Sequence, residues 1–149
     1  MLRLSKKMML ALEAVVDIAV NARPDPVQSK EITDRQGIPQ RYLEQIMQAL
    51  VHAGILKGVR GPRGGYRLAK ERRRITVAEV VHVVAELEAS SEPPLTQTSP
   101  IGEKVVKPMI ERFHHELMER LSTVTIEDLC NEVQAAAIPA TAKSMDFTI

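Results

Sequence analysis

Residues 39–68 constrain the fold of this 149-residue chain more than any other segment. Their first part repeats apolar residues at the spacing of a helix that packs on a core. The apolar face comprises Leu43, Ile46, Met47, Leu50 and Val51. Pro39 suits the first position of this helix, and Gly54 suits its end. Two short runs at 56–60 and 65–68 then flank a glycine-rich turn, so the segment predicts a helix followed by a hairpin, as in a winged helix-turn-helix.

The other face of the predicted helix carries side chains that can pair with the edges of DNA bases. Amide, guanidinium and carboxylate groups match the donors and acceptors of the major groove. These side chains are Gln40, Arg41, Glu44, Gln45, Gln48 and His52. The hairpin is basic, because Arg60 and Arg67 flank its turn and Arg63 lies within it. The segment therefore predicts double-stranded DNA as the partner.

Charge divides the chain into two halves. Residues 1–74 contain 15 lysines and arginines against 7 acidic residues, a charge of +8, whereas residues 75–149 contain 5 against 12, a charge of −7. We expect only the first half to meet a polyanion, although two ordinary solvated faces are the alternative. The single cysteine excludes an intrachain disulfide and suits a reducing cytoplasm. Apolar runs fall short of the roughly 20 residues of a membrane span, so we expect a cytoplasmic protein.

The rest of the sequence predicts a mainly α-helical fold. Ser5 is a candidate N-cap for a first helix that runs to about Asn21. Its apolar face comprises Met8, Leu12, Val15 and Ala19, and Glu13 and Asp17 argue against a signal peptide. A second helix at about 29–36 ends at Gly37, which gives helix-turn-helix spacing with the helix after Pro39.

Capping-box patterns predict two helices in the second half. Residues 76–79 open a fourth helix, with Val80, Val81, Val84 and Leu87 as its apolar stripe, and Thr125 opens a short sixth helix. Residues 89–100 read as an exposed loop. A long fifth helix is expected from about Gly102 to Leu121, in which Pro108 either starts the regular part or kinks it.

The fifth helix has the apolar spacing of a seam between paired helices. The seam comprises Val106, Ile110, Phe113, Leu117 and Leu121. Packing within one chain is the alternative, but symmetric operators are read by symmetric dimers, so we expect a homodimer. The chain then divides into a winged helix-turn-helix DNA-binding region (1–75), a linking helix and loop (76–100), dimerisation helices (101–137) and a C-terminal tail (138–149).

The sequences YLEQ (42–45) and VRGPRGGYRL (59–68), with LSKK near the start and TIEDL near residue 129, resemble the Rrf-type winged-helix transcriptional regulators. The resemblance implies a homodimeric DNA-binding regulator, with repression as its expected action. It places Tyr42, Glu44 and Gln45 in the major groove, and Arg60 in the minor groove with Arg63 there or at phosphates. Glutamate can accept from cytosine, glutamine can pair with adenine, and arginine suits a narrow minor groove. We expect Lys6, Arg41 and Lys57 to assist at the DNA backbone.

The sequence departs from the cluster-binding branch of that family. That branch carries three cysteines in the loop that corresponds to residues 90–102, where this chain has none. Lys107 matches a histidine ligand of the iron–sulfur regulators, and Met8 matches a carboxylate ligand of the nitric-oxide sensors. Two copies of Cys130 in a dimer fall short of the four thiolates of an ordinary cluster. We therefore expect no cluster or other cofactor, as in the branch of cysteine-metabolism repressors.

Other residues favour structural roles. Cys130 could be a thiol switch, but it shares a helical face with Ile126, Leu129 and Val133, which predicts burial. His114 and His115 point about a quarter-turn apart, so we expect solvated or interface histidines and no metal site. The sequence has no catalytic dyad or phosphate-binding loop, which argues against an enzyme. A winged helix that binds only another protein remains the alternative to DNA binding.

The last residues suggest a protein partner. Asp146, Phe147, Thr148 and Ile149 resemble the tails of proteins that dock into cysteine synthase. In that mode the terminal carboxylate is held by backbone N–H groups while the isoleucine fills an apolar pocket. An ordinary tail is the alternative.

Overall fold

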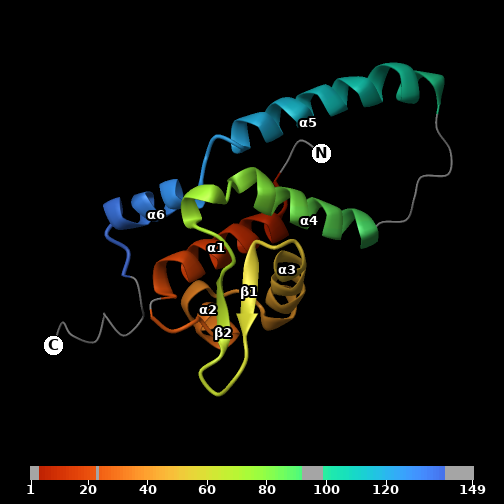
Figure 1. Cartoon of the computed structure of the whole chain (residues 1–149). Coiled ribbons are helices and arrows are strands. Elements are labelled where there is room, and N and C mark those ends of the chain that lie inside the picture. The colour runs from red at the N-terminus through yellow and green to blue at the C-terminus, as the bar shows by residue number, and fades with distance from the viewer. Residues whose placement is uncertain (1–3, 23, 92–98, 140–149) are drawn as a thin grey trace.

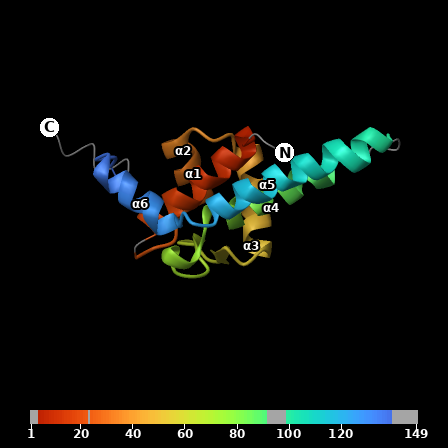
Figure 2. The ribbon, with the colours of Figure 1, turned by 90° about the horizontal axis from the view of Figure 1, so that it is seen from above.

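The computed structural model describes residues 4–22, 24–91 and 99–139. It is mainly helical, with one two-stranded sheet, and helix α1 (Lys6–Asn21) lies at its centre (Figure 1). Helices α2 (Ser29–Gln36), α3 (Gln40–His52), α4 (Val77–Ser91) and α6 (Ile126–Ala135) all contact α1. Helix α5 (Lys107–Leu121) packs instead against α4 and runs antiparallel to it (Figures 1 and 2).

Helix α1 forms where its local signals predict. The Ser5 hydroxyl accepts a hydrogen bond from the Met8 N–H at 3.2 Å, which caps the helix N-terminus. Small and branched side chains such as Ala11, Ala14 and Ile18 are fully buried, so neighbouring helices can approach α1 from several sides. Leu12, predicted on the buried face, is only half-buried.

The helix-turn-helix consists of α2, a short turn and α3. Gly37 ends α2 with a φ of 65°, a backbone conformation that glycine adopts without steric cost. The sequence suggested Pro39 as the first residue of α3, but Pro39 is its N-cap and the helix begins at Gln40. The predicted burial of Val51 is wrong, because its side chain is 37% exposed. Successive helical residues are about 100° apart, which places Val51 about 90° from the centre of the buried stripe.

The wing is an antiparallel hairpin of β1 (Leu56–Val59) and β2 (Gly65–Leu68). Arg60 therefore lies in the turn and not in the first strand, which is one residue shorter than predicted. The Val27 N–H donates to the Tyr66 carbonyl at 3.0 Å, and the Tyr66 N–H donates back at 2.7 Å. A Cβ atom on Gly65 would overlap the Val27 carbonyl oxygen, so this pairing requires glycine at position 65. The wing is thus bonded to the segment that precedes α2.

The second half follows a short 3-10 helix, η1 (Arg72–Arg74). The Val77 N–H donates to Val124 at 2.9 Å and the Ile126 N–H donates to Ile75 at 2.8 Å, which ties the starts of α4 and α6 together. Thr125 and Asp128 complete the predicted capping box of α6.

Helix α4 extends to Ser91, three residues into the segment 89–100 that the sequence suggested as a loop. The prediction of a loop from residue 89 is therefore wrong for residues 89–91. The Ser90 hydroxyl donates to the Leu87 carbonyl at 2.8 Å, and the Ser91 hydroxyl donates to the Glu88 carbonyl at 2.8 Å. Serines that were read as loop formers thus bond back onto the helix.

The predicted fifth helix begins with a π-helical turn, η2 (Gly102–Val106), before α5. The Lys107 N–H donates to the Gly102 carbonyl five residues earlier. Pro108 follows in the first turn of α5, directly after this π-helical turn, and as a proline it has no N–H to donate to the preceding turn. The regular part of the helix therefore starts beside Pro108, one of the two outcomes that the sequence allowed. No helix in the described ranges is long and apolar enough to cross a bilayer.

Candidate nucleic-acid interface

The polar face of α3 is open to solvent along its first turns. Leu43, Ile46 and Met47 are buried, so the side chains between them point outward. All five predicted DNA-contacting residues of the helix are exposed: Gln40, Arg41, Tyr42, Glu44 and Gln45. The Gln40 side-chain amide donates to the Glu44 carboxylate at 3.1 Å. This contact holds Glu44 in position while leaving its other oxygen available as an acceptor.

The N-terminal turn of α1 adds positive charge beside α3. The Lys7 Nζ lies 5.5 Å from the centre of the Tyr42 ring, a cation–π distance. Lys6, the predicted backbone contact, is exposed. The sequence interpretation missed Lys7, although its place in the same LSKK segment was the available signal. The structure therefore brings a lysine from α1 to a predicted base-reading residue.

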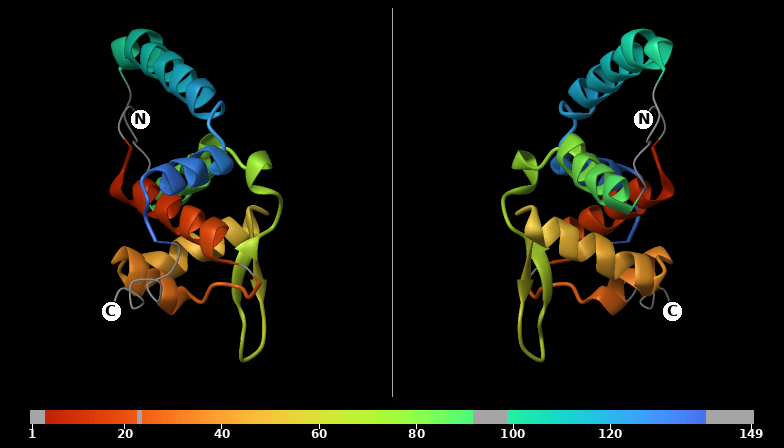
Figure 3. Two further views of the ribbon diagram at one scale, coloured as in Figure 1. Left: turned by 90° about the vertical axis from the view of Figure 1, so that its left-hand side faces the viewer. Right: turned by 90° about the vertical axis from the view of Figure 1, so that its right-hand side faces the viewer.

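The turn of the wing presents exposed cations. Arg60, Arg63 and Lys57 are all exposed, and Gly61 allows the turn with a φ of 114°. Figure 3 shows the hairpin extending beyond the helices, and β1 contacts α3 at its base. Arg67 is different, because it is half-buried and its guanidinium donates to the Pro24 carbonyl. Arg67 thus joins the wing to the loop before α2. Arg60 and Arg63 are the arginines that the turn exposes to solvent.

The arginines of η1 are partly neutralised. The Arg73 Nε bonds to the Glu71 carboxylate, and the Arg72 Nε lies 3.8 Å from Glu127 of α6. Arg72 and Arg73 therefore add less to the positive charge available to DNA than the sequence alone indicates. The positive charge relevant to α3 comes instead from the wing and from the start of α1.

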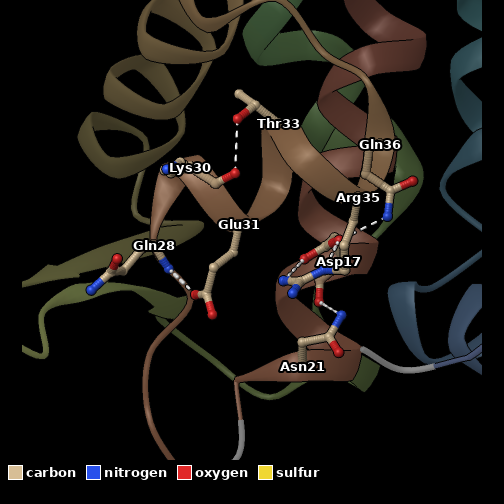
Figure 4. Close-up of polar contacts among 8 residues, drawn as sticks. All are labelled: Asp17, Asn21, Gln28, Lys30, Glu31, Thr33, Arg35 and Gln36. Carbon is tan, nitrogen blue, oxygen red and sulfur yellow. Dashed lines mark hydrogen bonds and ion pairs between the residues drawn. The ribbon is translucent and has the colours of Figure 1, made fainter. Parts of the chain in front are cut away.

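A buried ion pair fixes α2 on α1 (Figure 4). The Arg35 guanidinium donates to the two Asp17 oxygens at 2.8 and 2.9 Å, and the Gln36 amide donates to Asp17 at 2.7 Å. The Asp17 side chain is 0% exposed. Its hydrogen bonds to the Arg35 guanidinium raise the pKa of that group above its usual range. The sequence interpretation missed this network, since Asp17 and Arg35 are 18 residues apart.

Helix α5 and η2 leave a long apolar surface uncovered in the described chain. None of the residues of α5 is fully buried. Within the predicted seam, Val106 and Phe113 are each 45% exposed, whereas Ile110, Leu117 and Leu121 are half-buried. Ile101 and Val105 add side chains that are 70% and 64% exposed. Such a continuous apolar face on a helix is typical of a protein–protein interface.

The residues considered for sensing lie elsewhere. Cys130 is 5% exposed and packs in the core, as its helical face predicted. The His115 Nε2 lies 3.1 Å from the Glu119 carboxylate on the surface of α5. In the described part of the chain, no three His, Cys, Asp or Glu side chains are grouped to hold a metal. The predicted partner-binding residues Asp146, Phe147, Thr148 and Ile149 lie outside the described residues.

A helix-turn-helix whose second helix exposes polar side chains beside a basic hairpin defines a winged-helix DNA-binding protein. The chain belongs to the Rrf2 family, described as iron-dependent transcriptional regulators, whose sequence model matches residues 4–132. It is therefore a DNA-binding transcriptional regulator, and its relatives are regulators rather than enzymes.

Two relatives illustrate the similarity in sequence. A protein of Haemophilus influenzae that carries the name of an HTH-type transcriptional regulator is 36% identical over 137 residues, which cover 92% of this chain and 86% of that protein. The HTH-type transcriptional regulator IscR of Photorhabdus laumondii is 42% identical over 85 residues. This second match covers 57% of this chain and 52% of IscR, so the aligned part spans about half of that regulator.

Solved structures agree over most of the chain. IscR of T. potens superposes with a TM-score of 0.70 at 32% identity, covering 93% of both chains. CymR, the global cysteine regulator of B. subtilis, superposes with a TM-score of 0.67 at 29% identity, covering 89% of this chain and 98% of CymR. The winged-helix fold predicted from the sequence is confirmed.

Proposed function

We propose that this regulator is a homodimeric repressor that binds a specific duplex sequence through α3 and the wing. The observation that carries the proposal is the exposed face of Tyr42, Glu44 and Gln45 on a helix fixed by a buried core, beside the exposed Arg60 and Arg63. A rigid helix can hold side chains at the spacing of base edges, and a flexible basic turn can follow a groove.

The proposed roles follow from side-chain chemistry. Glu44 accepts from a cytosine amino group, Gln45 pairs with adenine, and Tyr42 contacts the same groove beside Lys7. Arg60 enters a narrow minor groove, where the negative potential is strongest. Phosphates are the expected partners of the remaining exposed residues: Lys6, Gln40, Arg41, Lys57 and Arg63.

The dimer is proposed to form through the uncovered apolar face of η2 and α5. That surface includes the exposed Val106 and Phe113, and pairing two copies would remove it from water. A two-fold dimer also presents two copies of α3 to a symmetric operator. On this proposal residues 1–75 form the DNA-binding region and residues 101–137 form the dimerisation region. Residues 76–100 connect the two, and residues 138–149 form a C-terminal tail.

We further propose that the protein works without an iron–sulfur cluster, unlike the description of its family. The sequence contains one cysteine, Cys130, which lies on α6 and is buried in the hydrophobic core. Lys107 matches the position of a histidine ligand in the iron–sulfur regulators that the sequence resembles. It is exposed, and its Nζ lies 3.8 Å from the Glu103 Oε2. Burial of Cys130 also disfavours a thiol switch. Docking of the C-terminal tail into cysteine synthase remains a prediction.

Selection of binding sites from a pool of random duplexes tests the proposal. We expect a palindromic consensus, and tight binding of that duplex over a scrambled duplex of equal length. Affinity should fall steeply with salt, because each neutralised phosphate releases about 0.9 counterion. Equal affinity for the selected and scrambled duplexes would refute sequence-specific readout. No detectable binding to any duplex would favour the protein-interaction alternative.

A further inference from the structure

A cavity of about 480 Å³ lies between α1 and α6, away from α3 and the wing. Leu12, Val16 and Val20 line it from α1, and Leu129 and Val133 line it from α6. Its volume is within the range of small-molecule sites, and its walls are mainly apolar, as is usual for such sites. The cavity also explains why Leu12 is only half-buried on a helix that is otherwise central to the core.

The charged side chains that line this cavity in the described part of the chain are all carboxylates. The carboxylates of Glu13 on α1 and Glu132 on α6 are exposed at its edge. Among the described residues that line the cavity, none is a lysine, arginine or histidine. Asp17 also lines it, but Arg35 neutralises that carboxylate. The uncompensated charge at the cavity therefore comes from Glu13 and Glu132.

Asn21 lies in the wall of the cavity but offers no acceptor to its interior. Its side-chain N–H donates to the Asp17 carbonyl at 3.0 Å, which fixes the orientation of the amide. Its Oδ1 atom is buried, so a ligand in the cavity does not reach it. The groups offered to a polar ligand are therefore the two carboxylates at the edge.

We propose that this cavity binds a small amphipathic cation, a primary ammonium attached to an apolar body. The apolar body contacts Leu12, Val16 and Val133, and the ammonium lies between Glu13 and Glu132. An ammonium provides three donors and a positive charge, which match the two carboxylates. A neutral ligand would gain no ion pair at this edge, and an anion would be repelled.

The cavity is connected to the helix-turn-helix through its own wall. Gln36, the last residue of α2, lines the cavity and donates to Asp17 at 2.7 Å, directly before the Gly37 turn. A ligand that contacts this wall thus acts on the hydrogen bonds that position α2 and α3. The resulting effect on DNA affinity rests on the proposed function, whereas binding in the cavity does not.

Binding is tested with three probes that share one apolar body: 4-phenylbutylamine, 4-phenylbutanol and 4-phenylbutyrate. Each is titrated into the full chain while amide shifts are followed by NMR and heats by calorimetry. The amine should bind most tightly, the alcohol more weakly and the carboxylate least, with shifts centred on residues 12–21 and 129–138. The proposal would be overturned if 4-phenylbutyrate bound as tightly as the amine, or if the amide shifts were centred on other residues.

Charge variants keep the test specific. The double variant Glu13→Gln and Glu132→Gln should weaken amine binding by about fivefold, the effect of two partly exposed ion pairs. The control Glu86→Gln removes an exposed carboxylate of α4 outside the cavity and should leave binding unchanged. An equal effect of the control would overturn the proposal. A variant that lacks residues 140–149 tests whether the tail is the occupant instead. If this removal shifts the NMR resonances of the cavity residues and the amine shifts none of them, the proposal is overturned.

The link to DNA is measured separately, on the selected duplex. Saturating amine should change the dissociation constant for DNA, and DNA should change the amine affinity by the same factor, because coupling between two sites is reciprocal. Amine binding with no change in DNA affinity would overturn the coupling. Failure to bind any duplex would refute the proposed function alone, since the NMR titration reads the cavity directly.

Discussion

The Arg35 guanidinium makes two hydrogen bonds to the Asp17 carboxylate, whose side chain is completely excluded from solvent. This pair joins the first helix of the helix-turn-helix to the central helix of the core. Gln36 adds a third hydrogen bond to the same carboxylate. The position of α2, and through the Gly37 turn that of α3, therefore depends on one buried negative charge.

Arg35→Ala should lower the free energy of unfolding by about 3–5 kcal/mol, because it leaves the buried Asp17 carboxylate without its cation. Urea unfolding at a fixed protein concentration measures the loss. Lys70→Ala, which breaks a surface pair with Glu79 at 3.3 Å, is the control and should cost less than about 1 kcal/mol. Similar losses of unfolding free energy in the two variants would show that the buried Asp17–Arg35 pair contributes no more to stability than a surface pair.

Gly65→Ala should destabilise the protein by about 2 kcal/mol. The added methyl group would overlap the Val27 carbonyl oxygen and separate Val27 from Tyr66. Gly58→Ala is the matched control on the paired strand, since a Cβ there meets no atom within 4 Å. Hydrogen exchange at the Val27 and Tyr66 amides should rise in the first variant only. Unchanged exchange in Gly65→Ala would contradict the expected loss of this pairing.

Arg60→Ala should weaken binding to the selected duplex by about 1–3 kcal/mol while leaving the fold intact, because Arg60 is exposed in the wing turn. Fluorescence anisotropy at several salt concentrations measures the change. Arg73→Ala is the control, because Arg73 already pairs with Glu71. Equal losses in both variants would indicate a general charge effect without a defined groove contact.

Glu44→Ala should relax the preference for one base pair by about 1–3 kcal/mol, because the helix loses a hydrogen-bond acceptor. Repeating the site selection with the variant shows which position of the consensus becomes degenerate. The same consensus at every position would refute the assigned role of Glu44. Gln40, which donates to Glu44 at 3.1 Å, should become more mobile in this variant.

Phe113→Asp should raise the dissociation constant of the dimer by about 100-fold, because the charge enters the apolar face once in each subunit. Sedimentation equilibrium measures the change, and affinity for a palindromic duplex should fall with it. His115→Asp adds the same charge about 200° further around the helix, so the dimer should persist. A dimeric Phe113→Asp protein would exclude α5 as the interface.

Features with local signals could be predicted from the sequence. Ser5 and Thr125 cap their helices with hydrogen bonds to residues three positions on, and Gly37 ends α2 in the left-handed conformation. Such signals lie within one turn of the chain. The periodicity of α3 likewise predicted which side chains of that helix are exposed, although the burial of Val51 at the edge of its stripe was misjudged.

Features that depend on distant segments could not be predicted. Asp17 finds Arg35 across two helices, and Arg67 bonds to Pro24 across 43 residues. No local pattern distinguishes an arginine that braces a loop from one that is presented to DNA. The LSKK segment was a signal for Lys7 as a cation, but its contact with Tyr42 could not be predicted, because only the packing of α1 beside α3 creates it.

The division of charge described for the two halves of the chain has a kinetic consequence. The cations of the wing lie at one end of the molecule (Figure 1), whereas α4 and α6 carry acidic residues and no lysine or arginine, so a net charge of only +1 conceals an electric dipole. On the proposed function, we expect this dipole to turn the wing toward a duplex before any contact forms. A nearly neutral protein can thus associate faster than random orientation allows, and salt slows it by screening the field.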